Sequence, residues 1–136
     1  MVDMNLEVHI VPVADVERSK QFYERLGWRF DSDVALPKDI RIVQFTPPGS
    51  GCSATLGKGI TAPGSAAAGL VVSDIEAAHA ELVGRGIEAS EVFHGPPFPL
   101  DARLRGPDPK RTSYAPFFSF NDPDGNTWLV QEGGRT

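Results

Sequence analysis

Apolar and polar positions along the chain follow two spacings, and each predicts a different element. A spacing of two residues is typical of half-buried strands, and one of three to four residues is typical of amphipathic helices. The strongest local pattern covers residues 117–132, where two apolar, aromatic-rich runs flank the polar segment 121–126. Because Pro123 presets φ for a turn and Gly125 tolerates a positive φ, this stretch predicts a β-hairpin.

The first half of the chain predicts a strand, a helix and three further strands. Residues 6–13 are rich in β-branched side chains and predict the first strand. Asp15 can cap a helix that has one apolar stripe, and Gly27 can end it as the first residue beyond the helix. The remaining strands are predicted at 28–34, 41–46 and 52–56, and a linker at 61–66.

This opening pattern repeats later in the chain at a displacement of 59 residues. Asp15 corresponds to Asp74, and Gly27 corresponds to Gly86. The second helix has an apolar face, and Ser73 with Glu76 can form a capping box at its start. After it come predicted strands at 87–93 and 113–120, separated by the proline-rich excursion 95–111.

Each half therefore reads βαβββ, and neither half can cover its own sheet alone. The sequence predicts an α+β fold in which the two modules form one curved, roughly eight-stranded mixed sheet. The helices are expected on the outer face and a groove on the concave face. We expect a single domain over residues 1–136, with module one at 1–60, the linker at 61–66 and module two at 67–132.

Composition narrows the class of protein further. The chain has 136 residues, of which 40% are hydrophobic and 23% are charged, and no apolar run is long enough to span a membrane. The formal net charge of −5 argues against nucleic acid or an anionic membrane as the main partner. The single cysteine, Cys52, excludes an internal disulfide, and the N-terminus has no signal-peptide pattern, so we expect a cytoplasmic protein.

Three separated motifs resemble the vicinal oxygen chelate superfamily, which contains glyoxalases, bleomycin-resistance proteins and extradiol dioxygenases. They are VADVERSKQFYERLGW at 13–28, VSDIEA at 72–77 and DPDGNTW at 122–128. The fold of this superfamily carries lyases, isomerases, dioxygenases and plain binding proteins, so the resemblance implies a fold rather than a reaction. It also implies a homodimer.

Enzymes of this superfamily bind a divalent metal through side chains that project into the groove. The resemblance places three of the usual ligand positions at Val8, Ala67 and Leu129, and none of these side chains has a donor atom. His9 is adjacent to one position but should face the opposite side of its strand. We therefore predict no metal and no other cofactor, unless the site persists in an atypical form. Glu132 and His79 are expected at the surface.

Hydrocarbon at the ligand positions favours an apolar groove for a small aromatic or lipophilic molecule. If Phe120 pairs with Thr127, and Phe118 with Leu129, both phenylalanines face the groove. The excursion 95–111 is long enough to be a binding loop, and His94 at its start can exchange a proton near neutral pH. The predicted ligand-binding residues are Val8, Ile10, Ala67, His94, Phe98, Arg103, Tyr114, Phe118, Phe120 and Leu129.

The sequence is compatible with three functions. The first is a metal-free protein that binds a small, largely apolar compound. The second is a glyoxalase-like lyase, isomerase or dioxygenase, with either an atypical metal site or metal-free acid/base chemistry by His94 or Tyr114. The third is an interaction module whose groove is closed.

Overall fold

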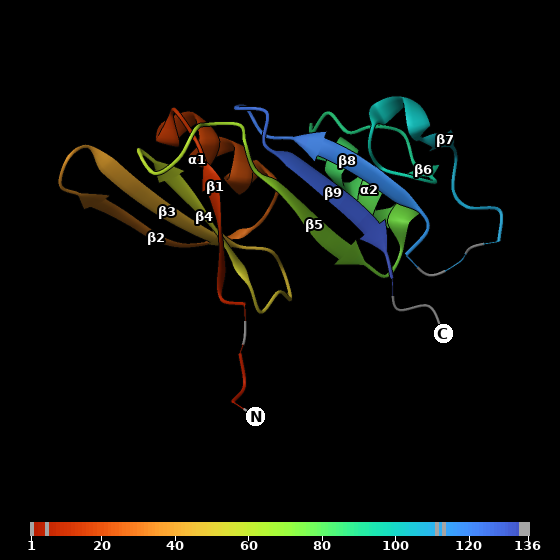
Figure 1. The fold of residues 1–136 in the computed structure, drawn as a ribbon, viewed down its shortest axis with the longest axis horizontal. Helices are drawn as coiled ribbons and strands as arrows, with labels where there is room; N and C mark the ends of the chain where they lie inside the picture. The colour runs from red at the N-terminus through yellow and green to blue at the C-terminus, as the bar shows by residue number, and fades with distance from the viewer. Residues whose placement is uncertain (1, 5, 111, 113, 134–136) are drawn as a thin grey trace. The chain divides into compact units, whose positions relative to one another are not determined.

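The computed structural model describes residues 2–4, 6–110, 112 and 114–133. The chain divides into two compact units, and Figure 1 shows the elements of each. The first unit contains Met1–Ala66 together with Asp122–Asn126, and the second contains Ala67–Asn121 together with Thr127–Thr136. The turn at 122–126 thus joins two strands of the second unit but belongs to the first.

The first unit is a four-stranded mixed sheet with one helix. Its strands lie in the order β1-β4-β3-β2, with β1 parallel to β4 and the other pairs antiparallel. The elements are β1 (Val8–Pro12), α1 (Val16–Arg25), β2 (Arg29–Leu36), β3 (Ile40–Thr46) and β4 (Ser53–Lys58).

The second unit is a five-stranded mixed sheet with one α-helix. Its strands lie in the order β5-β9-β8-β6-β7, and β5 is parallel to β9. The elements are β5 (Ala67–Val72), α2 (Ile75–Gly84), β6 (Phe93–His94), the 3₁₀ helix η1 (Leu100–Ala102), β7 (Leu104–Arg105), β8 (Phe117–Asn121) and β9 (Thr127–Glu132).

The internal repeat is visible at both ends of the two helices. Asp15 accepts a hydrogen bond from the Arg18 N–H at 3.1 Å, and Asp74 accepts one from the Ala77 N–H at 3.0 Å. Gly27 and Gly86 follow the helix ends with φ of 82° and 81°. This conformation is the left-handed one that glycine adopts without strain. The cap of α2 is therefore Asp74 itself rather than Ser73.

The α+β class and the two βαβββ-like modules are confirmed, but the single eight-stranded sheet is wrong. Each module closes its own sheet by pairing its first strand in parallel with its own last strand, which gives sheets of four and five strands in the described chain. Helix α1 packs on β3 and β4, and α2 packs on β8 and β9. Each sheet thus has one face under its helix, and we call the other its open face.

The strand predicted at 87–93 is much shorter in the structure. Only Phe93–His94 form a strand there, and Ala89 makes an isolated bridge to Phe120. The Ser90 hydroxyl accepts the Ser119 N–H at 2.9 Å, while the Ser90 N–H donates to the Ser119 carbonyl at 2.8 Å. Because a side-chain hydroxyl replaces a backbone acceptor here, the regular series of backbone hydrogen bonds between the strands is interrupted.

Two side chains that were expected at the surface are wholly or partly buried. Glu132 is 0% exposed, and its Oε2 accepts the Ile75 N–H at 3.0 Å. A carboxylate at the first residue of α2 interacts favourably with the positive end of the helix dipole, which explains its burial. The ring of His79 packs edge-on against Phe118 at 5.1 Å, and its Nε2 lies 2.9 Å from the Ser90 carbonyl.

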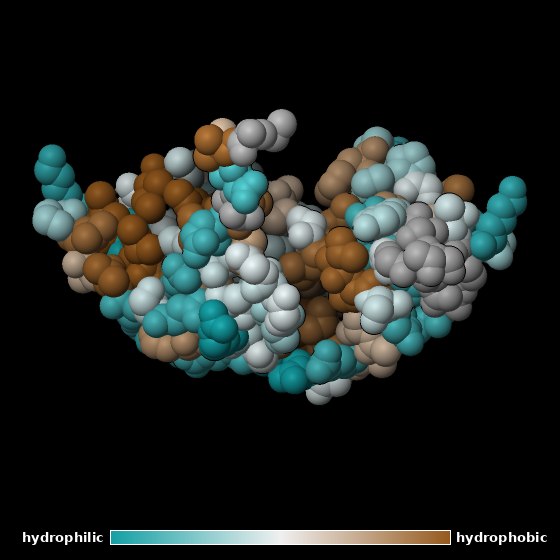
Figure 2. Space-filling view, turned by 90° about the horizontal axis from the view of Figure 1, so that it is seen from below, coloured by the Kyte–Doolittle hydropathy of each residue, from teal (hydrophilic) through white to brown (hydrophobic). Residues whose placement is uncertain are grey.

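Large apolar side chains also remain exposed along the edge of the first sheet. Strand β2 is an edge strand, and its exposed apolar residues include Phe30, Val34 and Leu36. Figure 2 shows hydrophobic surface on the left of the view, the side on which Figure 1 places β2 and β3. No described helix has the length and hydrophobicity that crossing a bilayer requires.

Candidate functional site

The open face of the second sheet carries a small apolar hollow. Strand register places Ala67 opposite Thr127, and Gly69 opposite Leu129, on neighbouring strands β5 and β9. These residues alternate with Trp128 and Val130, which are buried on the face toward α2. The hollow has a volume of about 190 Å³ and is lined by Ala67, Ala68, Gly69, Phe98, Thr127 and Leu129.

Because Gly69 has no side chain, nothing projects from this position of β5 into the hollow. A Cβ atom built at Gly69 would have a single neighbour within 4 Å among the described residues, the Leu129 carbonyl oxygen at 4.0 Å. The space above it is therefore not filled by any described side chain. A glycine within a strand often marks a position where a ligand or another backbone approaches closely.

Phe98 forms a wall of the hollow and comes from the loop between β6 and η1. Phe98 as a residue is 51% exposed. The loop is held at its base by His94, whose Nδ1 lies 2.7 Å from the Gly106 carbonyl oxygen. Because Phe93 lies on the open face, His94 next to it faces the other side of the sheet. The structure therefore does not bring His94 to the hollow.

Arg103 crosses the open face beside Phe98. Its Nε donates to the Pro97 carbonyl at 2.9 Å, and its Nη1 donates to the Ser119 hydroxyl at 3.0 Å. The guanidinium carbon lies 4.1 Å from the centre of the Phe93 ring and 5.7 Å from that of Phe98. Burial lowers the pKa of the Arg103 guanidinium from its ordinary value.

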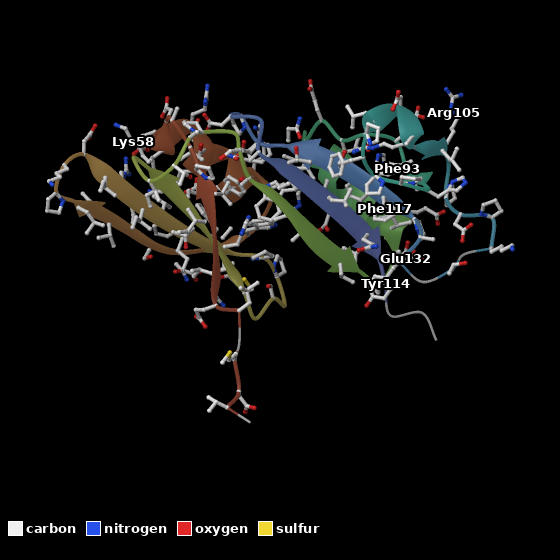
Figure 3. All side chains as sticks on the ribbon, in the orientation of Figure 1. Lys58, Phe93, Arg105, Tyr114, Phe117 and Glu132 are labelled. Atoms are coloured by element: carbon white, nitrogen blue, oxygen red, sulfur yellow. The ribbon has the colours of Figure 1, made fainter. Side chains whose placement is uncertain are left out.

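The aromatic base under Arg103 consists of Phe93 and Phe117. These residues are paired on the neighbouring strands β6 and β8, and their rings stack with centres 5.4 Å apart at 13°. Figure 3 labels both side chains, with Arg105 further out on β7. The stack holds the guanidinium against the sheet, and aromatic faces attract cations at such distances.

Tyr114 lies at the other end of β9, close to Glu132 in Figure 3. Its backbone has a φ of 66°, an uncommon value for a residue with a side chain. A Cβ atom built at Gly133 would fall within 3 Å of both the Tyr114 ring and Val71. Tyr114 therefore borders the carboxyl end of β5, and not the hollow at Gly69.

The predicted site residues fall into separate groups. Ala67, Phe98 and Leu129 lie together around the hollow, and Arg103 is next to Phe98. Val8 and Ile10 are partly exposed on the open face of the first sheet, where they pair with Ser53 and Thr55. His9 pairs with Ala54 and has the opposite orientation.

The expected pairing of the final hairpin is wrong by one residue. Phe118 pairs with Val130, and Phe120 pairs with Trp128. A shift of one residue moves side chains to the other face of a strand, so both phenylalanines are buried on the side toward α2. They do not line the hollow.

A polar cluster on the open face of the first sheet was not predicted. The Asp31 carboxylate accepts hydrogen bonds from Thr46 and from Gln44, and the Thr46 and Ser53 hydroxyls lie 2.7 Å apart. Hydrogen bonds, first from Thr46 and then from Arg29, lower the pKa of Asp31. The alternation of Gln44 with Thr46 in β3 was the signal that could have indicated it.

The metal site of the superfamily does not fit these residues. Val8, Ala67 and Leu129, the positions that correspond to the usual ligands, have hydrocarbon side chains that cannot coordinate a cation. Within the part of the chain that the structure describes, no three His, Cys, Asp or Glu side chains are grouped to hold a metal ion.

The two βαβββ-like modules, together with the sequence motifs that lie in them, identify the class of protein. The Glyoxalase/Bleomycin resistance protein/Dioxygenase superfamily model matches residues 7–130, and this chain belongs to that superfamily. A search of curated proteins finds no match.

Several solved structures resemble the chain over nearly its whole length. TnmS3, an antibiotic-binding protein from Streptomyces sp. CB03234, is 27% identical with a TM-score of 0.73, and the match covers 98% of this chain and 99% of TnmS3. A glyoxalase/bleomycin resistance protein from the same organism is also 27% identical, with a TM-score of 0.68 and coverage of 93% and 99%. A superfamily member from Sphaerobacter thermophilus DSM 20745 is 25% identical, with a TM-score of 0.69 and coverage of 96% and 98%.

Proposed function

We propose that this chain is a binding protein for a small, largely apolar or aromatic molecule. The ligand would lie on the open face of the second sheet, with part of it in the hollow between Phe98 and the strands β5 and β9. The observation that carries this proposal is the hollow of about 190 Å³ beside Gly69, whose lining is apolar except for Thr127. Concave, mostly apolar sites are where small molecules bind proteins.

The volume of the hollow limits what it can hold. A cavity of about 150 Å³ in another protein accommodates benzene. The hollow of about 190 Å³ is therefore large enough for one six-membered ring, and smaller than a site for a whole drug-sized molecule. We expect a ligand to place one ring above Gly69 and to extend beyond it over the sheet.

The comparison with TnmS3 supports a binding role. That protein is described as antibiotic-binding, and it matches this chain over nearly the full length of both. An enzymatic role has less support, because the usual metal positions have no donor atoms and the His94 ring is engaged with the Gly106 carbonyl. An interaction module with a closed groove is disfavoured by the open space at Gly69.

The test is a thermal-shift screen of aromatic compounds against the wild type and Gly69→Leu. A compound that binds the folded state raises the unfolding temperature by mass action. The leucine side chain enters open space and suits a strand, so we expect Gly69→Leu to fold and to lose the ligand-induced shift.

Gly51→Leu is the matched control for this screen. Gly51 also has no atom within 4 Å of a built Cβ, and it lies in the loop between β3 and β4 of the first unit. We expect Gly51→Leu to keep the shift. Compounds that stabilise the Gly69→Leu variant as strongly as the wild type would contradict binding in the hollow.

We also propose that the protein acts in the cytoplasm as a homodimer. The exposed edge strand β2, with apolar side chains at Phe30, Val34 and Leu36, supports self-association, because an uncovered edge is a template for pairing. Sedimentation of the wild type and of Val34→Lys tests it, with a shift toward monomer expected for the variant. A monomeric wild type at micromolar concentration would contradict it.

A further inference from the structure

Arg103 retains a hydrogen-bond donor that no described residue accepts. Nε and Nη1 are bound to Pro97 and Ser119, whereas Nη2 is buried and has no hydrogen-bond partner in the described residues. Arg103 also has no ion pair with any carboxylate that the structure describes. A buried donor without an acceptor costs free energy, and more so when it is charged.

Strand register connects this guanidinium to the hollow. Gly69 pairs with Leu129, Leu129 pairs with Ser119, and the Ser119 hydroxyl accepts from Arg103. Neighbouring strands lie about 4.8 Å apart, so Ser119 is about 10 Å from the open space above Gly69. Ser119, which binds Arg103, and the space above Gly69 therefore lie in the same row of paired residues. The distance between them is about the length of a two-ring aromatic compound.

Phe98 is shared by both places. Its ring lines the hollow and lies 5.7 Å from the Arg103 guanidinium carbon, near the outer limit of an effective cation–π contact. Because Phe98 is half exposed and borders both places, a ligand held against its ring lies next to the guanidinium. The unused Nη2 donor of that guanidinium is then the group that an oxygen atom of the ligand would meet.

We propose that Arg103 determines the specificity of the site and selects aromatic compounds that carry an oxyanion, a carboxylate or a phenolate. The inference rests on the proposed function, since it assigns a ligand class to the same hollow. The aromatic ring occupies the space above Gly69, and the oxyanion accepts a charge-assisted hydrogen bond from Nη2. The remaining bonds of Arg103 keep its side chain in place before the ligand arrives.

The test compares two probes of similar shape at pH 7.5, 2-naphthoate and the neutral 2-naphthalenemethanol, by calorimetric titration. We expect the wild type to bind 2-naphthoate at least about 10-fold more tightly, the size of one charge-assisted hydrogen bond. Arg103→Gln should abolish this preference, so that the two probes bind with affinities within about 2-fold of each other. A wild type that binds both probes equally would overturn the inference and leave the binding function intact.

Two further variants separate recognition from structural support. Arg105→Gln removes an exposed arginine of the neighbouring strand β7, and we expect it to keep the preference. Arg103→Lys keeps the charge without the planar fork, and we expect an intermediate preference. If Arg103→Gln weakens both probes equally, or Arg105→Gln removes the preference as well, Arg103 is not the selecting residue. If neither probe binds, the assigned ligand class is wrong, and the wider screen with Gly69→Leu decides separately on the proposed function.

Discussion

The hydroxyl of Tyr23 donates a hydrogen bond of 2.9 Å to Oδ2 of Asp122, although the two residues are 99 positions apart in the chain. Tyr23 is 0% exposed and Asp122 is 5% exposed. The bond joins the last turn of α1 to the turn between β8 and β9, and both residues belong to the first unit.

Other residues of this turn make similar contacts. Asn126 donates from Nδ2 to the Pro12 carbonyl at 2.8 Å, and Asp124 accepts from the Ala14 N–H at 3.2 Å. The motif around Tyr23 and the motif DPDGN are therefore two sides of one buried polar contact. Because the residues of these motifs form a structural contact, the motifs identify the fold of the superfamily and do not indicate which reaction a member catalyses.

Tyr23→Phe is expected to destabilise the protein by about 1–3 kcal/mol, because it leaves a buried carboxylate oxygen with one donor fewer. Urea unfolding of the variant and the wild type measures the difference. The matched control is Tyr114→Phe, which removes the hydroxyl of a half-exposed tyrosine and should change stability by less than about 0.5 kcal/mol. Equal losses in both variants would show that the Tyr23–Asp122 bond contributes nothing specific.

The sequence predicted the features that depend on local chemistry. The cap at Asp15, the glycine stops at Gly27 and Gly86 and the final hairpin follow from short patterns, and the structure has all of them. Each is determined by residues that are close together along the chain.

Features that depend on pairing between distant segments were predicted less well. The hairpin register was wrong by one residue, which reversed the faces of Phe118 and Phe120. Turn residues alone do not reveal how the turn uses its hydrogen bonds, and Asp122, which accepts from the N–H groups of Asp124 and Asn126, sets the register here. The role of Ser119 as the acceptor for Arg103 likewise depends on how the loop folds back, which no local pattern encodes.

Glu132→Gln is expected to cost about 1–3 kcal/mol of stability. The buried carboxylate accepts the Ile75 N–H at the start of α2, and an amide replaces the negative charge there with a weaker acceptor. The free energy of urea unfolding measures the loss. Glu88→Gln, at an exposed position, is the control. An unchanged stability of Glu132→Gln would mean that the charge does not support the helix terminus.

Gly64→Ala should be more destabilising than Gly49→Ala. Both glycines have a positive φ, 80° and 76°, so a side chain adds similar backbone strain of about 1–2 kcal/mol. At Gly64 the new Cβ would also meet the Asp124 carbonyl oxygen, a backbone atom, whereas at Gly49 there is nothing within 4 Å. Thermal unfolding of the two variants side by side isolates this clash. Equal losses would indicate that the Asp124 turn moves aside freely.

Removal of divalent metal should leave the thermal stability of the protein unchanged. Since the positions that would supply ligands hold Val8, Ala67 and Leu129, dialysis against EDTA is expected to leave the unfolding temperature the same, and added Zn²⁺ or Ni²⁺ should not raise it. Elemental analysis of the purified protein provides a second measurement. One tightly held metal ion per chain would contradict the prediction and direct attention to His9.

Acid should remove the stabilisation that Asp33 contributes. Its carboxylate accepts hydrogen bonds from Arg41 at 2.9 and 2.6 Å and from Lys20 at 3.3 Å. The Arg41 hydrogen bonds, with a smaller contribution from Lys20, lower the pKa of Asp33 from 3.8 to about 2. Because the folded pKa is below the unfolded one, the ionised carboxylate favours the folded state. This stabilisation is complete above about pH 4 and declines as the pH falls toward 2.

Asp33→Asn should therefore unfold at a lower temperature than the wild type at pH 7, and the two melting curves should converge as the pH approaches 2. Asp101→Asn is the control, because Asp101 is exposed and has no ion pair in the described chain. At pH 7 it should differ from the wild type by less than Asp33→Asn does. If the Asp33→Asn difference is constant down to pH 2, the Arg41 contact does not stabilise the folded state through the charge of Asp33. If only the Asp33→Asn curve converges with that of the wild type, the contact between Asp33 in β2 and Arg41 in β3 accounts for part of the acid sensitivity of the first unit.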